Sequence, residues 1–378
     1  MENSRAASLK VLMYSLDRQL FEEGGDARRR LAEYGRLVGS LDVVVLTPRG
    51  KTPQTISANV RLHPTNSRSR LFYLRDGARL GKKLIDGNAC DVVVTQEPYF
   101  TGYIGWRLAK RRKVKLLVSS YGNNVFDPHW LSESWKHRML KMIGRRVFER
   151  ADAIQTDGFE TVEDLKARYG DKVFWKPIIP ANIGDFRCDE AKPARPVRIL
   201  FVGRLADQKN LPLLLDVMER MKSAVGPGAA AFTIVGDGPQ RRFLEAELKR
   251  RGLGDMVRYF PKLDRREIVE VFATHHLLLL TSLYEGLAKV FMEAAAAGLP
   301  IVTTRVSGVA NIVRDGETGL VVEQGDAEGL VKSLRALIDD PERLQRFSKG
   351  IRADFREKYS FEGMIEIQRN IFDFLAAR

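Results

Sequence analysis

The sequence predicts an α/β protein that has a parallel sheet in each of two domains. Short apolar runs alternate with helical patterns along both halves of the chain, which is typical of strand–helix–strand units. The chain has 378 residues, more than one core usually supports, and 44% of them are hydrophobic. The run LLLLT at 277–281 is continuously apolar up to its last residue, as expected of a parallel strand buried on both faces.

The first half of the chain contains the predicted N-terminal domain, residues 1–186. Its predicted strands are at 11–15, 43–47, 92–95, 114–119, 154–156 and 174–178. Its predicted helices are at 26–40, 101–112 and 160–169. The polar segment RCDEAKPARP at 187–196 contains two prolines and predicts a linker between the domains.

The second half repeats this alternation and gives the predicted C-terminal domain, residues 197–355. Its strands are expected at 197–202, 231–235, 277–281 and 301–304. Asp326 is a suitable N-cap for a helix that ends near Asp339. Residues 356–378 contain an amphipathic helix, FEGMIEIQRNIFDFLAAR, at the C-terminus.

Two glutamates follow the apolar run at 277–281. Glu285 lies in the turn after it, and Glu293 lies eight residues later, inside a helix that begins near Ala288. The free N–H groups at a helix start favour an anion, and both carboxylates can face one ligand resting there. The layout suits a nucleotide sugar. The alternative is that these glutamates cap the helix or pair with a lysine such as Lys289.

An independent basic signal follows the strand predicted at 197–202. Gly203 and Arg204 come directly after it, and Lys209 comes just before the next helix. Arg204 can bind phosphate oxygens bidentately, and Lys209 supplies a second charge. Together they predict a diphosphate site.

A third turn has the sequence Gly236-Asp237-Gly238, directly after the strand at 231–235. The missing glycine side chains let the backbone approach a flat base. Many turns of this composition bind nothing, so this signal supports the other two rather than standing alone.

The order of four segments resembles the donor-binding half of glycosyltransferase family 4, whose members are retaining enzymes of the GT-B fold. These segments are GRLADQKN (203–210), IVGDGP (234–239), SLYEGLAKVFMEAAAAGLPIV (282–302) and DGETGLVV (315–322). The resemblance implies two Rossmann-like domains facing across a cleft. It also implies a C-terminal helix that crosses back to the first domain, which would be the acceptor side.

The resemblance also implies roles for single residues. Arg204 and Lys209 match the family's diphosphate pair, Glu285 the carboxylate near the sugar hydroxyls, and Glu293 the one on the ribose. The expected catalytic residues are therefore Arg204, Lys209 and Glu285. The further donor-binding residues are Gly203, Asp237, Gly238, Gly286, Leu287, Ala288, Lys289 and Glu293.

The chain departs from the family pattern at three places. Leu287-Ala288 stands where Phe-Gly is common, and Asn311 stands where glutamate is common, so that position receives no role. Tyr121-Gly122 stands where many members carry a His-Gly pair near the reaction centre. The acceptor-side candidates are loops at strand ends, namely Gly24, Gly25, Glu97, Tyr121, Gly122 and Asn123. Glycine before a helix more often reflects plain turn chemistry, which is the alternative for Gly24 and Gly25.

The implied reaction moves a hexosyl unit, with retention, from a nucleoside diphosphate sugar to a hydroxyl of a saccharide or lipid-linked acceptor. Bacterial cell-envelope polysaccharide or glycolipid synthesis is the expected setting. No cofactor is expected, and the chain has no Asp-x-Asp pair to indicate a metal. A nucleotide-sugar epimerase and a non-catalytic nucleotide-binding protein of the same fold remain alternatives. A dehydrogenase is disfavoured because no GxGxxG turn follows the strand at 11–15.

The charge of +14 is concentrated between residues 101 and 150, where 12 basic residues face 3 acidic ones. Aromatic and aliphatic residues interrupt these cations, which predicts contact of residues 107–150 with an anionic membrane surface. A solvated basic face over an ordinary core is the alternative, and no nucleic-acid-binding motif is present. Cys90 and Cys188 lack CxxC spacing and predict ordinary thiols. A cytoplasmic protein, peripheral on the inner face of the cell membrane, is expected.

Overall fold

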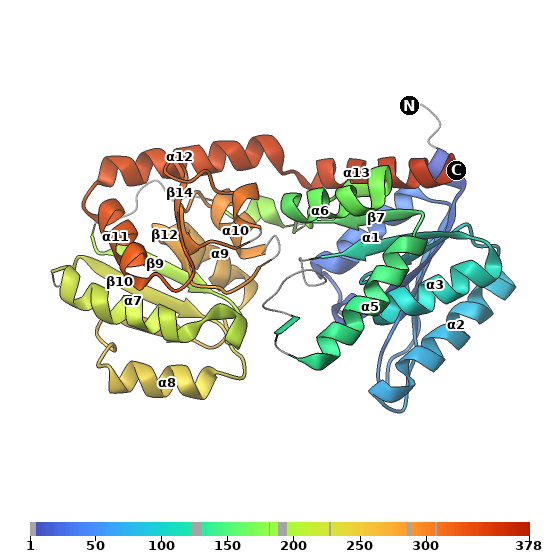
Figure 1. The fold of residues 1–378 in the computed structure, drawn as a ribbon, viewed down its shortest axis with the longest axis horizontal. Coiled ribbons are helices and arrows are strands. Elements are labelled where there is room, and N and C mark those ends of the chain that lie inside the picture. Colours follow the sequence, from blue (N-terminus) through green and yellow to red (C-terminus); the bar gives the residue numbers. More distant parts are fainter. Residues whose placement is uncertain are drawn as a thin grey trace. The chain divides into compact units, whose positions relative to one another are not determined.

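The computed structural model describes residues 5–121, 131–132, 134–180, 182–187, 195–226, 228–285, 289–306 and 308–378. The chain divides into two compact units (Figure 1). The first unit consists of residues 1–181 together with 361–378, and the second of residues 182–360. Each is an α/β unit built on its own sheet.

The first unit has an eight-stranded sheet in the order β3-β4-β2-β1-β5-β6-β7-β8. Every strand pair in it is parallel except β3 with β4. The strands are β1 (Lys10–Ser15), β2 (Ser40–Val45), β3 (Gln54–Ser57), β4 (Val60–Pro64), β5 (Val92–Thr95), β6 (Lys115–Ser120), β7 (Ala153–Thr156) and β8 (Val173–Trp175).

Helices cover both faces of this sheet (Figure 1). On one face lie α1 (Asp26–Leu37) and α13 (Phe361–Ala376). On the other lie α2 (Tyr73–Gly87), α3 (Phe100–Arg112), α5 (Trp135–Arg150) and α6 (Phe159–Tyr169). Because α13 comes from the end of the chain, the C-terminus completes the first unit's core, where Phe374 meets Phe174 edge-on at 4.9 Å between ring centroids.

The second unit has a six-stranded parallel sheet in the order β11-β10-β9-β12-β13-β14. The strands are β9 (Val197–Val202), β10 (Ala230–Val235), β11 (Val257–Phe260), β12 (Leu277–Leu280), β13 (Ile301–Thr304) and β14 (Gly319–Val322). The helices are α7 (Leu211–Ala224), α8 (Arg241–Arg250), α9 (Arg265–Thr274), α10 (Lys289–Ala296), α11 (Ala327–Ile338) and α12 (Pro341–Lys358). All four leucines of the central strand β12 are completely buried, as its apolar run predicts.

Short 3₁₀ helices occur at several connections. They are η1 (Arg5–Ser8), η2 (Arg18–Phe21), η3 (Arg70–Phe72), η4 (Gly170–Lys172), η5 (Ile183–Asp185), η6 (Asp207–Lys209) and η7 (Val309–Asn311). No helix in the described part of the chain is long and apolar enough to cross a membrane.

The predicted α/β class with two parallel sheets is confirmed. Several details differ from the sequence-based expectations. The strand expected at 174–178 ends at Trp175, because Pro177 has no N–H for the sheet. The second unit begins at Asn182, before the linker expected at 187–196, and most of that linker lies outside the described residues. Residues 356–360, expected with the C-terminal helix, belong to the second unit, whereas the helix itself starts at Phe361 as the predicted run does.

Candidate functional site

Three loops leave the same edge of the second sheet. Strands β10, β9 and β12 are neighbours in that order and run parallel, so their carboxyl ends lie side by side. The loops that follow them begin at Gly236, Gly203 and Thr281. This is the edge at which open α/β sheets bind ligands.

A buried ion pair joins two of these loops. The Lys209 ammonium at the end of η6 donates to the Glu285 carboxylate, which lies 76 residues further along the chain. Each residue is only 8% exposed. Glu285 also accepts a hydrogen bond from the Ser282 hydroxyl at 2.8 Å and a longer one from the Gln208 amide at 3.4 Å. The lysine paired with Glu285 is therefore Lys209, whereas the sequence suggested Lys289 as a possible partner.

The local backbone makes room for this pair. A Cβ atom at Gly203 would lie 2.8 Å from Cε of Lys209, so a side chain at that position would push the lysine stem away. The Thr281 hydroxyl donates to the carbonyl oxygen of Lys209 at 2.8 Å and holds the end of η6 against β12. Asn210 adopts a left-handed conformation with φ of 48° and caps helix α7. The position of Lys209 is thus fixed from both sides.

Arg204 differs from Lys209 in its surroundings. Its side chain is exposed, and it has no hydrogen-bond or ion-pair partner within the described part of the chain. A guanidinium in that state can bind an incoming carboxylate or phosphate without first losing a protein partner.

The Gly236–Gly238 turn packs directly on the backbone after β9. A Cβ at Gly236 would lie 1.9 Å from the carbonyl oxygen of Gly203, and one at Gly238 would lie 2.4 Å from that of Leu205. The Leu205 N–H donates to the carbonyl of Asp237 at 3.0 Å. The Asp237 carboxylate accepts from the Gly238 N–H at 2.8 Å, so this side chain stabilises its own turn. Backbone packing thus requires both glycines, and the predicted approach of this turn to a flat base stays a prediction.

Neighbouring strands support the turn that carries Glu285. The Thr304 hydroxyl at the end of β13 donates to the carbonyl of Ser282 at 2.6 Å. The Gln324 amide, after β14, donates to the carbonyl of Leu283 at 2.7 Å. Sequence reasoning missed Ser282, Gln208 and Gln324. For Gln208 a signal existed, since it precedes Lys209 in the GRLADQKN segment.

The remaining predicted donor-binding residues lie on or before α10. Lys289 is exposed at the first position of the helix, and Glu293 is half-buried one turn later. Gly286, Leu287 and Ala288 lie outside the described residues. Asn311, which received no role, is buried, and its carbonyl accepts from the Tyr359 hydroxyl at 2.7 Å.

The acceptor-side candidates belong to the first unit. Gly24 has φ of 76°, a conformation that favours glycine, and Gly25 is the N-cap of α1. Turn geometry therefore accounts for Gly24 but not for Gly25, whose φ is −70°, and the acceptor-side role of both stays a prediction. Gly122 and Asn123 lie outside the described residues.

Glu97 follows β5 and caps the N-terminus of α3. Its carboxylate accepts from the backbone N–H groups of Tyr99 at 2.6 Å, of Phe100 at 3.1 Å and of Thr101. Burial raises the pKa of Glu97 above its ordinary value, although these hydrogen bonds oppose the shift. A structural role for Glu97 is thus visible, and its role towards an acceptor stays a prediction.

Tyr121 lies at the end of β6 in a polar cluster that the sequence did not predict. Its hydroxyl accepts from the Gln155 amide at 3.1 Å, and burial raises its pKa. Nearby in the same unit, the ammonium of Lys176 contacts the Tyr34 hydroxyl at 2.6 Å. Lys176 is 1% exposed, and burial lowers its pKa well below the ordinary lysine value.

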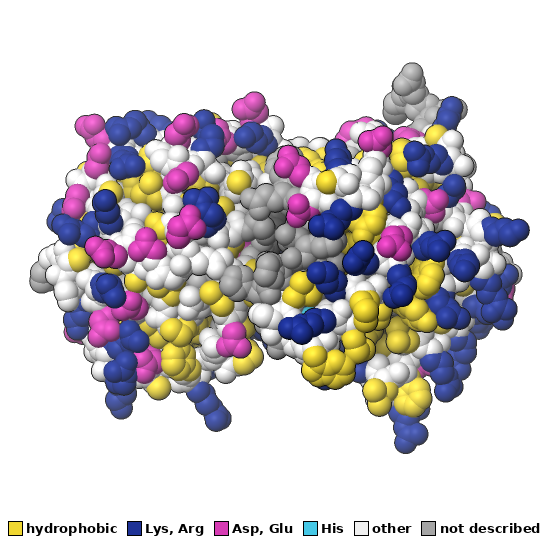
Figure 2. Space-filling model, in the orientation of Figure 1, with side chains coloured by type: hydrophobic (Ala, Val, Ile, Leu, Met, Phe, Trp, Pro, Cys, Tyr) yellow, Lys and Arg dark blue, Asp and Glu magenta, His cyan; other side chains and the backbone are white. Residues whose placement is uncertain are grey.

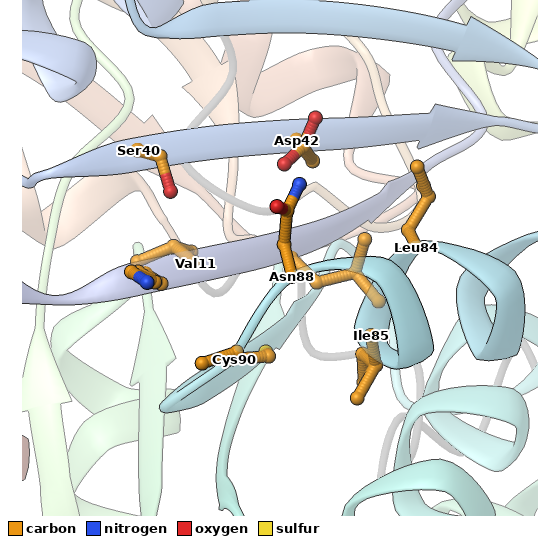
Figure 3. A pocket seen from close by; sticks show the side chains of 10 residues that line it. Val11, Ser40, Asp42, Leu84, Ile85, Asn88 and Cys90 are labelled. Atoms are coloured by element: carbon orange, nitrogen blue, oxygen red, sulfur yellow. The ribbon is translucent and has the colours of Figure 1, made fainter.

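A small pocket in the first unit lies at the other edge of the sheet (Figure 3). It is lined by residues from the starts of β1 and β2 and from the end of α2, including Ser40, Asp42 and Asn88, together with Cys90. Burial raises the pKa of Cys90 to about 11, so its thiol is a poor nucleophile at neutral pH. This pocket is separate from every residue predicted for the site.

Two family descriptions match this chain. Residues 24–173 match the Glycosyl transferase 4-like domain, and residues 183–354 match the Glycosyl transferases group 1. The chain belongs to glycosyltransferase family 4. The predicted family is confirmed.

Curated relatives of this family 4 chain are similar at a moderate level. It is 29% identical to the sulfoquinovosyl transferase SQD2 of Arabidopsis thaliana over 74% of this chain and 56% of that protein. It is 28% identical to a glycogen synthase of Mycobacterium tuberculosis over 48% of this chain and 43% of that protein. The match therefore spans about half the length of these relatives.

Solved structures resemble the family 4 chain over nearly its whole length. Sucrose-phosphate synthase from Thermosynechococcus elongatus has a TM-score of 0.80 at 18% identity, with 96% of this chain and 98% of that chain covered. Anabaena Alr3699/HepE, solved in complex with UDP-glucose, has a TM-score of 0.74 at 14% identity, with 98% and 100% covered. At these identities the likeness shows the fold, which is GT-B.

Proposed function

We propose that this family 4 chain transfers a glycosyl unit from a nucleoside diphosphate sugar to a hydroxyl of a saccharide or lipid-linked acceptor. The observation that carries the proposal is the group of charged residues at the carboxyl ends of β9 and β12. There the buried Lys209–Glu285 pair lies in loops that leave neighbouring strands, and the exposed Arg204 follows β9 directly. Family membership and the carboxyl-edge position point to the same ligand class.

Each of the three residues has a distinct task in this proposal. Arg204 binds diphosphate oxygens as a bidentate donor. Lys209 gives one N–H to Glu285 and keeps others for a phosphate oxygen, because an ammonium has three. Glu285 fixes the direction of that ammonium and places a carboxylate near the sugar hydroxyls. Charge that builds on the leaving diphosphate thus meets donors that are already in place.

A uridine nucleotide linked to a hexose is the first donor to test. HepE was solved with UDP and with UDP-glucose, and another solved neighbour is a lipopolysaccharide outer core galactosyltransferase. In our proposal transfer proceeds with retention, and the leaving phosphate accepts the proton of the attacking hydroxyl on the same face. The fixed cations supply the positive charge that other transferases take from a metal, so no metal or cofactor is required. The ribose contact is assigned to Glu293.

The place of action is the inner face of a membrane. The basic residues within 107–150 are proposed to hold the protein there as a peripheral cytoplasmic enzyme, in the synthesis of a cell-envelope polysaccharide or glycolipid. The excess of cations over acids in this segment supports the assignment.

The test is thermal stabilisation by UDP, GDP, ADP, CMP and their common sugar conjugates. Arg204→Ala is the test variant, and Arg346→Ala on α12 is the matched control, since Arg346 is also exposed. We expect one nucleotide to stabilise the wild type and Arg346→Ala but not Arg204→Ala. Turnover of that donor should fall by about two orders of magnitude in Arg204→Ala.

Other outcomes separate the alternatives. Stabilisation without transfer to any acceptor would favour a non-catalytic nucleotide-binding protein. Conversion of the donor to another nucleotide sugar without an acceptor would favour an epimerase. NMR of the product decides between retention and inversion, and assays with and without EDTA decide the metal requirement.

A further inference from the structure

Large apolar side chains are exposed mainly in the first unit. Of the ten described residues of this kind, eight belong to it. Leu71 is 90% exposed and Trp135 is 66% exposed, so neither side chain packs into the unit's own core. The others in this unit are Leu16, Phe72, Leu74, Phe100, Met139 and Met142. We call these eight residues the apolar rim.

The topology places the rim at one edge of the sheet. Helix α2 ends shortly before β5 begins, α3 shortly before β6, and α5 shortly before β7. Each helix therefore runs back from the carboxyl edge of the sheet to the amino edge. Seven of the rim residues lie in η3 or in the first half of one of these helices, and Leu16 directly follows β1. The rim thus shares the carboxyl edge with Glu97 and Tyr121, two predicted acceptor-side residues.

A basic groove runs beside the rim between α2 and α3. It has a volume of about 800 Å³. Leu74 and Tyr103 line it near the carboxyl edge, and Lys82, Lys110 and Arg111 line it further along both helices. Because α2 and α3 run in the same direction, the groove changes from apolar to basic along its length.

Among the described residues, four of the five cations that line the groove have no carboxylate partner, and the fifth, Arg79, lies 3.6 Å from Asp76. Arg107 donates to the Tyr103 hydroxyl at 3.1 Å and lies 5.7 Å from the centre of that ring. Its charge is therefore positioned without being cancelled by a carboxylate. Helix α3 contains four cations and no acid, and α5 contains six cations and one acid. Figure 2 shows hydrophobic side chains over α5 and neighbouring helices of this unit, bordered by lysine and arginine.

We infer that this face docks on an anionic lipid bilayer, with the apolar rim among the upper acyl chains and the basic groove at the lipid phosphates. A nucleic acid would also match the cations and would find Phe72, Phe100 and Trp135 for base stacking, but the other five rim residues are leucines and methionines, which do not stack on bases. Exposed aliphatics bordered by cations match a membrane surface instead.

This docking deepens the proposed function and rests on it. Because the rim and the acceptor-side residues share one edge of the first unit, a docked enzyme presents its acceptor loops to the lipid surface. The acceptor is then a saccharide carried by a membrane lipid rather than a free sugar.

Flotation with lipid vesicles tests the docking. We expect binding to vesicles of phosphatidylglycerol and phosphatidylcholine at three to seven, and little binding to phosphatidylcholine alone. The double variant Lys110→Gln/Arg111→Gln should bind roughly 25-fold more weakly, about fivefold for each cation removed. The matched control is Arg346→Gln/Lys349→Gln, which removes two exposed cations from α12. Equal losses in both double variants would show unspecific attraction and overturn the inference.

Insertion of the rim has its own readout. Lipids brominated on the acyl chains should quench the tryptophan fluorescence, and the quenching should fall markedly in Trp135→Phe although three other tryptophans remain. Met139→Ser/Met142→Ser should weaken binding roughly tenfold or more, while Phe243→Ser, at an exposed phenylalanine of the second unit, should not. Vesicle binding without quenching would leave only electrostatic contact and would contradict the rim's role.

The outcome is separable from that of the proposed function. If the protein binds no vesicles but a nucleotide still stabilises it through Arg204, the docking and the proposed membrane placement are wrong, and the proposed glycosyl transfer stands. If it binds RNA at the same face in place of vesicles, with the same variants affected, the partner is wrong. If no nucleotide stabilises the protein although vesicles bind, the proposed function fails and the membrane surface remains.

Discussion

Removal of the Lys209 ammonium should destabilise the second unit strongly. In Lys209→Ala the Glu285 carboxylate, which is 8% exposed in the native structure, keeps only Ser282 and Gln208 among the donors described above. Breaking a buried ion pair in this way costs about 3–5 kcal/mol of unfolding free energy. For a unit of this size the melting temperature falls by about 2–4 °C per kcal/mol, which gives a decrease of about 6–20 °C.

Calorimetry and urea denaturation measure this effect, with Arg204→Ala as the matched control. Arg204 is exposed, so its removal should change the unfolding free energy by no more than about 0.5 kcal/mol. The double variant Lys209→Met/Glu285→Leu should recover most of the loss, because it removes both charges. A single variant that unfolds within 1 °C of the wild type would refute the claim that the buried Lys209–Glu285 pair contributes strongly to stability.

Three other positions give checkable outcomes. Burial lowers the pKa of Lys176, so between pH 7 and pH 10 the unfolded chain binds more protons at this residue than the folded chain does. The free energy of unfolding should therefore rise from pH 7 towards pH 10. Urea titrations of Lys176→Met/Tyr34→Phe should lack that rise. Gly238→Ala should cost roughly 1–3 kcal/mol by calorimetry and weaken nucleotide binding, because its Cβ meets the Leu205 backbone. Glu97→Ala should cost about 0.5–2 kcal/mol through the lost α3 cap, whereas Glu97→Gln, which keeps an acceptor, should cost less in the same scans.

The strands that the sequence predicted best are those with continuous apolar runs, such as β9 and β12. Strand β3 was missed because every residue in it is partly or fully exposed, so it has no such run. Helix α2 was missed because glycines at 77, 81 and 87 lower its helical propensity. Two of them have a packing reason, since a Cβ at Gly81 would lie 1.7 Å from the Tyr14 hydroxyl and one at Gly77 would lie 2.9 Å from Leu46.

The candidate site was predicted residue by residue but not as an arrangement. Each segment was interpreted by itself, so Lys209 was assigned to the diphosphate and Glu285 to the sugar hydroxyls. The contact between them joins residues far apart in the sequence, and it depends on β9 and β12 being neighbours in the sheet. The buried Lys176 was missed for the same reason, because only the packing of α1 on the sheet brings Tyr34 to it.

The pairing of Lys209 with Glu285 changes the charge balance at the donor edge. In the proposed function a bound diphosphate carries at least two negative charges, and the charge of Lys209 is already opposed by a carboxylate. Arg204 and the exposed Lys289 at the start of α10 must then supply most of the net attraction, helped by the helix N-terminus. Lys209 contributes instead a donor of fixed direction, which matters most when charge moves onto the leaving phosphate. Loss of Arg204 should therefore lower both the nucleotide affinity and the turnover rate. Loss of the buried Lys209–Glu285 pair should mainly lower the turnover rate and the stability of the second unit.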